Sequence, residues 1–273
     1  MSIIPKLTGG RRLIHDAITD GRWISRGGPG NYVEIFEDFY GLVGATSVTA
    51  PFAVTEDGST NASGAMIASA SGEYRLLHTT DSETQAMLIS TGGLKAVSPT
   101  SSTIFEARVK INLSVDSTFD TASGYEVIVG LATAGSAVSK TAAAFDGFAD
   151  TVAFRLGGGA TAANHIYVEG DDGTTDVAPT DTGVDFVSGT FVKLRIDMTS
   201  LSSVKFFIDG ERVLAGTTFD FSAMAETDYL EPYILFARTS ASGTERAHSL
   251  DVDYVHISSL RTGITTGLGQ GGN

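Results

Sequence analysis

The chain of 273 residues contains no cysteine, only six prolines and a single tryptophan. The absence of cysteine excludes a disulfide scaffold, a zinc–thiolate site and a cysteine nucleophile. No apolar run approaches the roughly 20 residues that cross a bilayer, so we expect no membrane-spanning segment and no membrane partner. No apolar run of about 7–15 residues follows the first charge, so we expect no signal peptide.

Positive charge is also scarce, because 18 Lys and Arg face 32 Asp and Glu, for a formal net charge of −14. This balance argues against nucleic acid as the main partner, since phosphate binding needs a positive face. The cations are unevenly placed: residues 1–26 carry a net charge of +3, which leaves −17 on the rest of the chain. A basic arm on an acidic body can bind the acidic body of a neighbour; a solvated terminus is the alternative.

What the chain has in abundance is small residues, since Gly, Ser and Thr make up a third of it. An apolar share of 42% still provides for a real core. The clearest ordered pattern is residues 105–111, where apolar and charged side chains alternate strictly. A period of two predicts a half-buried β-strand.

Residues 191–214 predict a three-stranded meander. Apolar side chains alternate with charged ones over 192–198, and Val204, Phe206 and Ile208 repeat the period of two. Asp209-Gly210 then separates the second strand from a third, and this dipeptide favours a two-residue type I′ turn.

Further strands are predicted at 125–132, 152–156, 165–169, 229–238 and 250–254. The first of these is apolar on both faces and is expected in the centre of a sheet. Short helical turns are expected at 6–18, 141–150 and 221–226 only. We therefore predict an all-β protein, an antiparallel jelly-roll β-sandwich spanning 31–261, with an extended N-terminal arm (1–30) and a short Gly-rich C-terminal tail (262–273).

Four segments, in this order, resemble the concanavalin A-like lectin/glucanase jelly-roll superfamily: 104–111, 192–197, 204–213 and 250–255. The strand–Asp-Gly–strand hairpin and the closing Leu-Asp-Val-Asp-Tyr-Val strand carry the resemblance. Residues 36–41, Phe-Glu-Asp-Phe-Tyr-Gly, resemble the opening strand of sandwich proteins in tailed-phage virions. The superfamily includes glycosidases, lectins and structural modules, so the resemblance implies a fold more than a function.

Catalysis is not expected. Glucanases of this superfamily place two acids on one strand face as Glu-x-Asp-x-Glu or Glu-x-Asp-x-x-Glu. The first string is absent, and the second occurs only at residues 226–231, Glu-Thr-Asp-Tyr-Leu-Glu. Glu169-Gly170-Asp171-Asp172 begins correctly, but no second Glu follows. Asp251 and Asp253 share a strand face without an acid partner.

Metal and cofactor sites are not expected either. His248 and His256 flank the two aspartates of the closing strand, and we interpret them as part of a polar strand face rather than as metal ligands. The acidic loop of Asp171, Asp172 and Asp176 could bind calcium, but a solvated turn explains it better. No cofactor is predicted.

The leading hypothesis is a virion protein made in the host cytoplasm, a phage capsid decoration or cement protein. Its partners would be the major capsid protein or other virion subunits, with a homo-oligomer expected. The arm would bind a neighbour by burying apolar area and pairing its arginines with carboxylates. The alternatives are a glycan-binding tail-fibre or spike module and a glucanase-like glycosidase. The candidate partner-binding residues of the arm are Arg11, Arg12, Leu13, Ile14, Arg22, Trp23 and Arg26.

Overall fold

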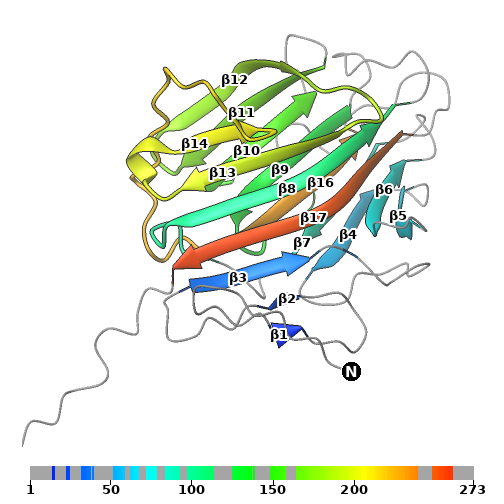
Figure 1. The fold of residues 1–273 in the computed structure, drawn as a ribbon, viewed down its shortest axis with the longest axis horizontal. Helices are drawn as coiled ribbons and strands as arrows, with labels where there is room; N and C mark the ends of the chain where they lie inside the picture. The colour runs from blue at the N-terminus through cyan, green and yellow to red at the C-terminus, as the bar shows by residue number, and fades with distance from the viewer. Residues whose placement is uncertain are drawn as a thin grey trace, which may run out of the picture.

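The computed structural model describes residues 14–15, 23–24, 32–37, 39, 52–58, 62–67, 72–78, 84–92, 97–113, 125–136, 138, 148–157, 164–238 and 248–260. These residues form two antiparallel sheets that pack face to face as a sandwich (Figure 1). The predicted fold class is therefore confirmed. No helix in this part of the chain is long and apolar enough to cross a membrane.

The first sheet, called sheet A here, has the strand order β1-β2-β3-β17-β8-β13-β14-β15, and β6 pairs with β17 and carries β5. Its strands are β1 (Ile14–His15), β2 (Trp23–Ile24), β3 (Tyr32–Glu37), β5 (Ala62–Ile67), β6 (Glu73–His78), β8 (Thr103–Asn112), β13 (Phe191–Met198), β14 (Lys205–Ile208), β15 (Glu211–Val213) and β17 (His248–Leu260).

The second sheet, called sheet B, has the order β12-β11-β10-β9-β16-β7-β4. Its strands are β4 (Ala53–Gly58), β7 (Gln85–Ser90), β9 (Tyr125–Thr133), β10 (Asp150–Gly157), β11 (His165–Asp172), β12 (Asp176–Asp185) and β16 (Leu230–Arg238). The 3₁₀ turn η2 (Leu201–Ser203) joins β13 to the segment that leads into β14.

The core lies between the sheets because each strand turns its apolar positions inward. In β8 the burial alternates at every residue, as the charge pattern predicts. Phe154 of sheet B packs edge-on against Phe206 of sheet A, with ring centroids 5.4 Å apart. Burying a large apolar side chain of this kind contributes about 1.5–3 kcal/mol.

The long strand β17 organises sheet A. One side of β17 pairs with β8 throughout, while the other side pairs first with β6 and then with β3. A bulge between Val252 and Tyr254 leaves Asp253 as an extra residue. The bulge shifts the alternation, so the inward residues are Leu250 and Val252 before it and Val255 and Ile257 after it.

The local predictions from the sequence are confirmed at their strongest points. β13, β14 and β15 form the meander, and Asp209 and Gly210 both have positive φ, 51° and 90°. β9 lies inside sheet B between β10 and β16.

Other expectations need correction. The segment 36–41 is confirmed as strand only at its start, because β3 spans Tyr32–Glu37 and Phe39 has φ 51°, which is not strand geometry; residues 38, 40 and 41 lie outside the described residues. Ile14–His15 is a strand, not part of a helical turn. The polar or Gly-rich strands β4, β5 and β12, as well as β6 and β7, were not predicted.

The division into arm, sandwich and tail stays a prediction, because residues 262–273 and most of 1–30 lie outside the described residues. Within 1–30, β2 pairs with β3 and β1 pairs with β2, so two short pieces of the arm extend the chain's own sheet.

Candidate functional site

The predicted arm residues are placed only in part. Ile14 lies in β1 opposite Ile24, and Trp23 lies in β2 opposite Phe36, so their backbones join sheet A. The other predicted contacts lie outside the described residues: Arg11, Arg12, Leu13, Arg22 and Arg26. The binding role of all seven stays a prediction.

The outer face of sheet B carries an ion-pair triad that the sequence did not suggest. Arg155 on β10 contacts Glu126 on β9 and Glu169 on β11, each through an N···O distance of 2.8 Å. All three side chains are at most 5% exposed. One guanidinium therefore ties three neighbouring strands together, since it can meet two carboxylates at once.

An apolar cluster covers much of the same face. Phe148, two residues before the start of β10, packs edge-on against Tyr233 with ring centroids 5.4 Å apart. Burial, together with the charge of Glu126, raises the pKa of Tyr233 well above its ordinary value. This face is therefore closed where the cluster lies: Ala86, Leu88, Ile128, Ala132, Ala153, Tyr233, Leu235 and Ala237.

Glu231 on the outer side of β16 is fully buried and serves the backbone. It accepts hydrogen bonds from the N–H and hydroxyl of Thr91, at 3.0 and 2.6 Å, and from the N–H of Gly135 at 2.6 Å. These contacts hold two loops to the end of sheet B, which is a structural role.

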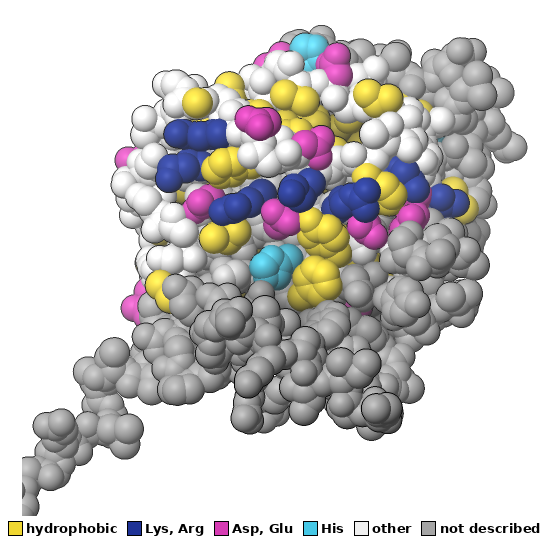
Figure 2. All heavy atoms as spheres, in the orientation of Figure 1, with side chains coloured by type: hydrophobic (Ala, Val, Ile, Leu, Met, Phe, Trp, Pro, Cys, Tyr) yellow, Lys and Arg dark blue, Asp and Glu magenta, His cyan; other side chains and the backbone are white. Residues whose placement is uncertain are grey.

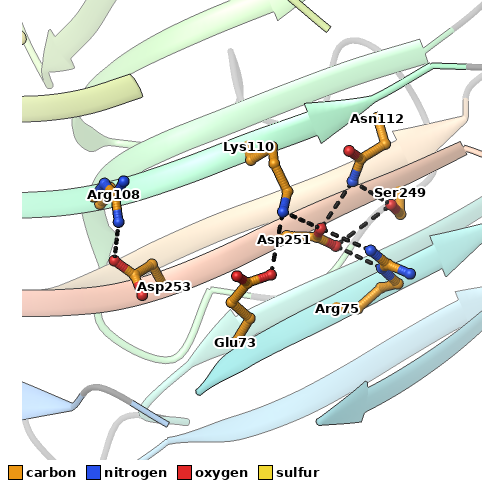
Figure 3. Close-up of polar contacts among 8 residues, drawn as sticks. All are labelled: Glu73, Arg75, Arg108, Lys110, Asn112, Ser249, Asp251 and Asp253. Carbon is orange, nitrogen blue, oxygen red and sulfur yellow. Dashed lines mark hydrogen bonds and ion pairs between the residues drawn. The ribbon is translucent and has the colours of Figure 1, made fainter. Parts of the chain in front are cut away.

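The outer face of sheet A is different, because it is covered with partly exposed charged side chains (Figure 2). Its centre is Asp251, which receives Arg75 from β6 and Asn112 from β8 and lies 3.2 Å from the amine of Lys110 (Figure 3). Burial works against the charge of Asp251, but these hydrogen bonds hold its pKa below the ordinary value.

A second pair lies beside this centre. Arg108 donates to Asp253 at 2.6 Å, so the bulge residue is used to place a carboxylate (Figure 3). Tyr254 donates to Glu106 at 2.6 Å, and burial and this hydrogen bond raise the pKa of Tyr254. The regular alternation expected for 250–254 would have turned Tyr254 inward; the bulge places it on the outer face instead.

Cationic residues gather on this one face. The described part of the chain holds nine Lys and Arg residues, and Arg155 and Arg238 are buried. The other seven all alternate with inward residues on strands of sheet A and therefore point outward: Arg75, Arg108, Lys110, Lys193, Arg195, Lys205 and Arg212. Aromatic rings lie among them, with Phe191 under Arg108 and Lys110 and Phe207 under Arg195.

The residues considered for metals are placed apart. His248 is buried against Tyr125, with ring centroids 4.4 Å apart, whereas His256 lies on the outer face of sheet A beside Phe36. Asp171 and Asp172 accept hydrogen bonds from backbone N–H groups of the turn that follows them, but Asp172 is buried, so the turn is not solvated throughout. No group of three or more metal-ligating side chains occurs among the described residues.

Sequence reasoning missed the two features with the densest electrostatics, the Arg155 triad and the cationic face. A signal for the second was present, since charges occupy every outward position of 105–111 and 192–198. The triad gave none, because its members lie on three strands whose register the sequence does not reveal.

Neither a protein-family model nor a curated protein sequence matches this chain. Similar solved structures exist at low sequence identity. A protein of unknown function from Shewanella oneidensis MR-1 is 12% identical with a TM-score of 0.51, and the match covers 86% of this chain and 90% of that one. LamAcat from Zobellia galactanivorans is 11% identical with a TM-score of 0.51, over 82% of this chain and 96% of that one.

The carbohydrate recognition domain of Emp46p is 10% identical with a TM-score of 0.50, over 81% of this chain and 97% of that one. At such identities the likeness concerns the fold alone. The likeness supports the predicted antiparallel β-sandwich, while membership of the concanavalin A-like lectin/glucanase superfamily stays a prediction.

Proposed function

We propose that this chain is a structural protein of a virion, a capsid decoration or cement protein that works by binding and not by catalysis. One observation carries the proposal: a chain with a net charge of −14 places on one face all seven Lys and Arg of its described part that are not buried. Such a face suits an acidic protein surface, because complementary potentials guide and orient association. The basic arm would add a second contact.

A lack of catalysis is supported by the state of the acids on sheet B. A retaining glycosidase needs one protonated carboxyl group and one carboxylate facing an open site. Glu126 and Glu169 are both buried against Arg155, so neither faces an open site. We expect no release of reducing sugar from β-glucans and no change on replacing Glu169.

Binding to shells tests the proposal directly. Purified phage shells lacking the protein are incubated with the full chain and with two variants. One variant lacks residues 1–26, and the other has the five cations of that segment changed to Gln: Lys6, Arg11, Arg12, Arg22 and Arg26. The Gln variant keeps the backbone of β1 and β2. It therefore shows the effect of lost charge on binding without exposing the edge of β3, which the deletion also exposes. We expect both variants to sediment with shells far less than the full chain; equal sedimentation would refute the role of the arm.

A glycan-binding module is the second candidate. The specific observation in its favour is a group of three rings on the outer face of sheet A, where Phe36 lies 5.7 Å from Tyr254 and 5.9 Å from His256 between centroids. Aromatic rings beside hydrogen-bonding groups can hold sugars. The likeness to a carbohydrate recognition domain is consistent with it. A glycan array with wild-type protein and Tyr254→Ala distinguishes the candidates, because only sugar binding depends on that ring.

A further inference from the structure

Four cations surround one aromatic ring at the β15 side of sheet A, and together they are called the basic patch. Arg195, Phe207 and Arg212 lie directly opposite one another on three adjacent strands. Lys193 and Lys205 lie two residues away on the same face of β13 and β14. Because strands are about 4.8 Å apart, the patch is compact and its charges repel one another.

The patch is poorly balanced by its own surroundings. Arg195 lies 3.5 Å from Asp197, and its guanidinium lies over the ring of Phe207. Asp197 lies opposite Lys205 on the neighbouring strand, and Glu106 lies opposite Arg195. Even so, Lys193, Lys205 and Arg212 form no ion pair within 4.0 Å among the described residues, so four cations face two carboxylates. This differs from Arg75, Arg108 and Lys110, which all contact aspartates of β17. An outside anion would therefore remove repulsion that the fold leaves in place.

The opposite face of the sandwich carries a matching set of four carboxylates, called the acidic strip. Asp171 of β11 faces Asp176 of β12, and Asp181 and Asp185 follow along β12 on the same outer face of sheet B. His165 contacts Asp181 at 2.8 Å and Asp185 at 3.1 Å. These contacts leave both carboxylates exposed, with 42% and 63% of their side chains accessible. The last three aspartates are exposed, so the strip is open to a partner.

The two sets cannot meet within one molecule, because each lies on the outward side of its own sheet. Both lie toward the same edge of the sandwich, where Figure 1 shows β12 and β11 above β14 and β13. A second copy placed behind the first would bring its basic patch against the acidic strip of the first. Four cations would then meet four carboxylates.

We infer that copies of this chain bind one another front to back, the basic patch of one copy against the acidic strip of the next. Such a contact is heterologous, so it builds rings or open rows, not closed two-fold dimers. The overall charge of −14 on each copy opposes association at long range. At about 0.15 M salt that repulsion is screened beyond roughly 8 Å, while pairs in contact persist.

The test measures self-association of the isolated full chain by sedimentation velocity, without shells. We expect concentration-dependent association at about 0.15 M salt that is lost at about 1 M. Two variants each turn an attraction into a repulsion: Lys205→Glu with Arg212→Glu, and Asp176→Lys with Asp185→Lys. Each alone is expected to weaken association by at least about tenfold.

Mixing the two variants is the decisive step, because each then offers the surface that the other needs. Association is expected to return in the mixture. The control, Asp220→Lys with Glu226→Lys, changes the net charge as much as the strip variant at exposed sites outside both surfaces, and it should associate like wild type. Circular dichroism checks that all variants are folded.

A chain that stays monomeric at every concentration and salt overturns the inference, as does a mixture that fails to associate. Acidic glycan is the competing occupant of the basic patch. If polygalacturonate binds the wild type but not the Lys205→Glu, Arg212→Glu variant, and the protein alone stays monomeric, the patch serves a glycan and not a second copy.

Discussion

Arg75 on β6 holds Asp251 on β17 through two hydrogen bonds, from Nε at 2.6 Å and from Nη2 at 2.8 Å. The two residues are 176 positions apart in the sequence but directly opposite in the sheet. Lys110 and Asn112 reach the same carboxylate from β8 on the other side (Figure 3). Asp251 is thus the point at which three strands of sheet A are joined by side chains.

Replacing this carboxylate should destabilise the fold more than replacing its neighbour. Asp251→Asn leaves Arg75 and Lys110 without their shared anion, and we expect a loss of about 2–3 kcal/mol. Asp253→Asn removes one pair with a partly exposed arginine and should cost less than about 1 kcal/mol. Urea unfolding of both variants measures the difference; equal losses would show that Asp251 has no special role.

The same carboxylate should make stability depend on pH in acid. Because the pKa of Asp251 is lower in the folded protein than its ordinary value of 3.8, its contribution is complete above that value. The contribution is lost as the pH falls through the folded pKa. The stability difference between wild type and Asp251→Asn should therefore shrink steadily below about pH 4. A difference that stays constant down to pH 2 would contradict this account.

For the triad of Arg155, Glu126 and Glu169 on sheet B, we predict that the stability losses of single substitutions do not add up in combined variants. Arg155→Met leaves Glu126 and Glu169 buried close to each other without a cation, and we expect a loss of about 3–5 kcal/mol. Adding Glu126→Gln and Glu169→Gln to that variant should recover much of the loss, because no buried charge remains. Thermal unfolding of the single, double and triple variants checks the prediction. A triple variant that is less stable than Arg155→Met would contradict this account, because removing the unpaired buried charges would then have brought no recovery.

The approach of β9 to β10 depends on Gly130. A Cβ at this position would lie 2.3 Å from the carbonyl oxygen of Val152 and 2.5 Å from Cα of Ala153, so the strands would have to move. Gly130→Ala should cost about 2 kcal/mol or more. Gly216→Ala is the matched control, because nothing lies within 4 Å of its added Cβ. Comparable unfolding midpoints for the two variants would argue against the close contact.

Local sequence determined the elements whose signal lies in neighbouring residues. Alternation along 105–111 and 192–198 is enough to specify half-buried strands, and Asp209-Gly210 is enough to specify a turn with two positive φ angles. A central strand follows from an apolar run such as 125–132. Strands with weak propensity, among them Ala62–Ile67 and Asp176–Asp185, were missed because pairing with a neighbour, not their own composition, makes them strands.

The tertiary structure alone decided which distant residues meet. The bulge at Asp253 turns Tyr254 outward, Arg155 finds Glu126 and Glu169 on flanking strands, and four cations from three strands surround Phe207. Each of these depends on strand order and register, and a shift of one residue in register would send every side chain to the other face. The charge of −14 belongs to the sequence; its separation into a basic face and an acidic strip belongs to the fold.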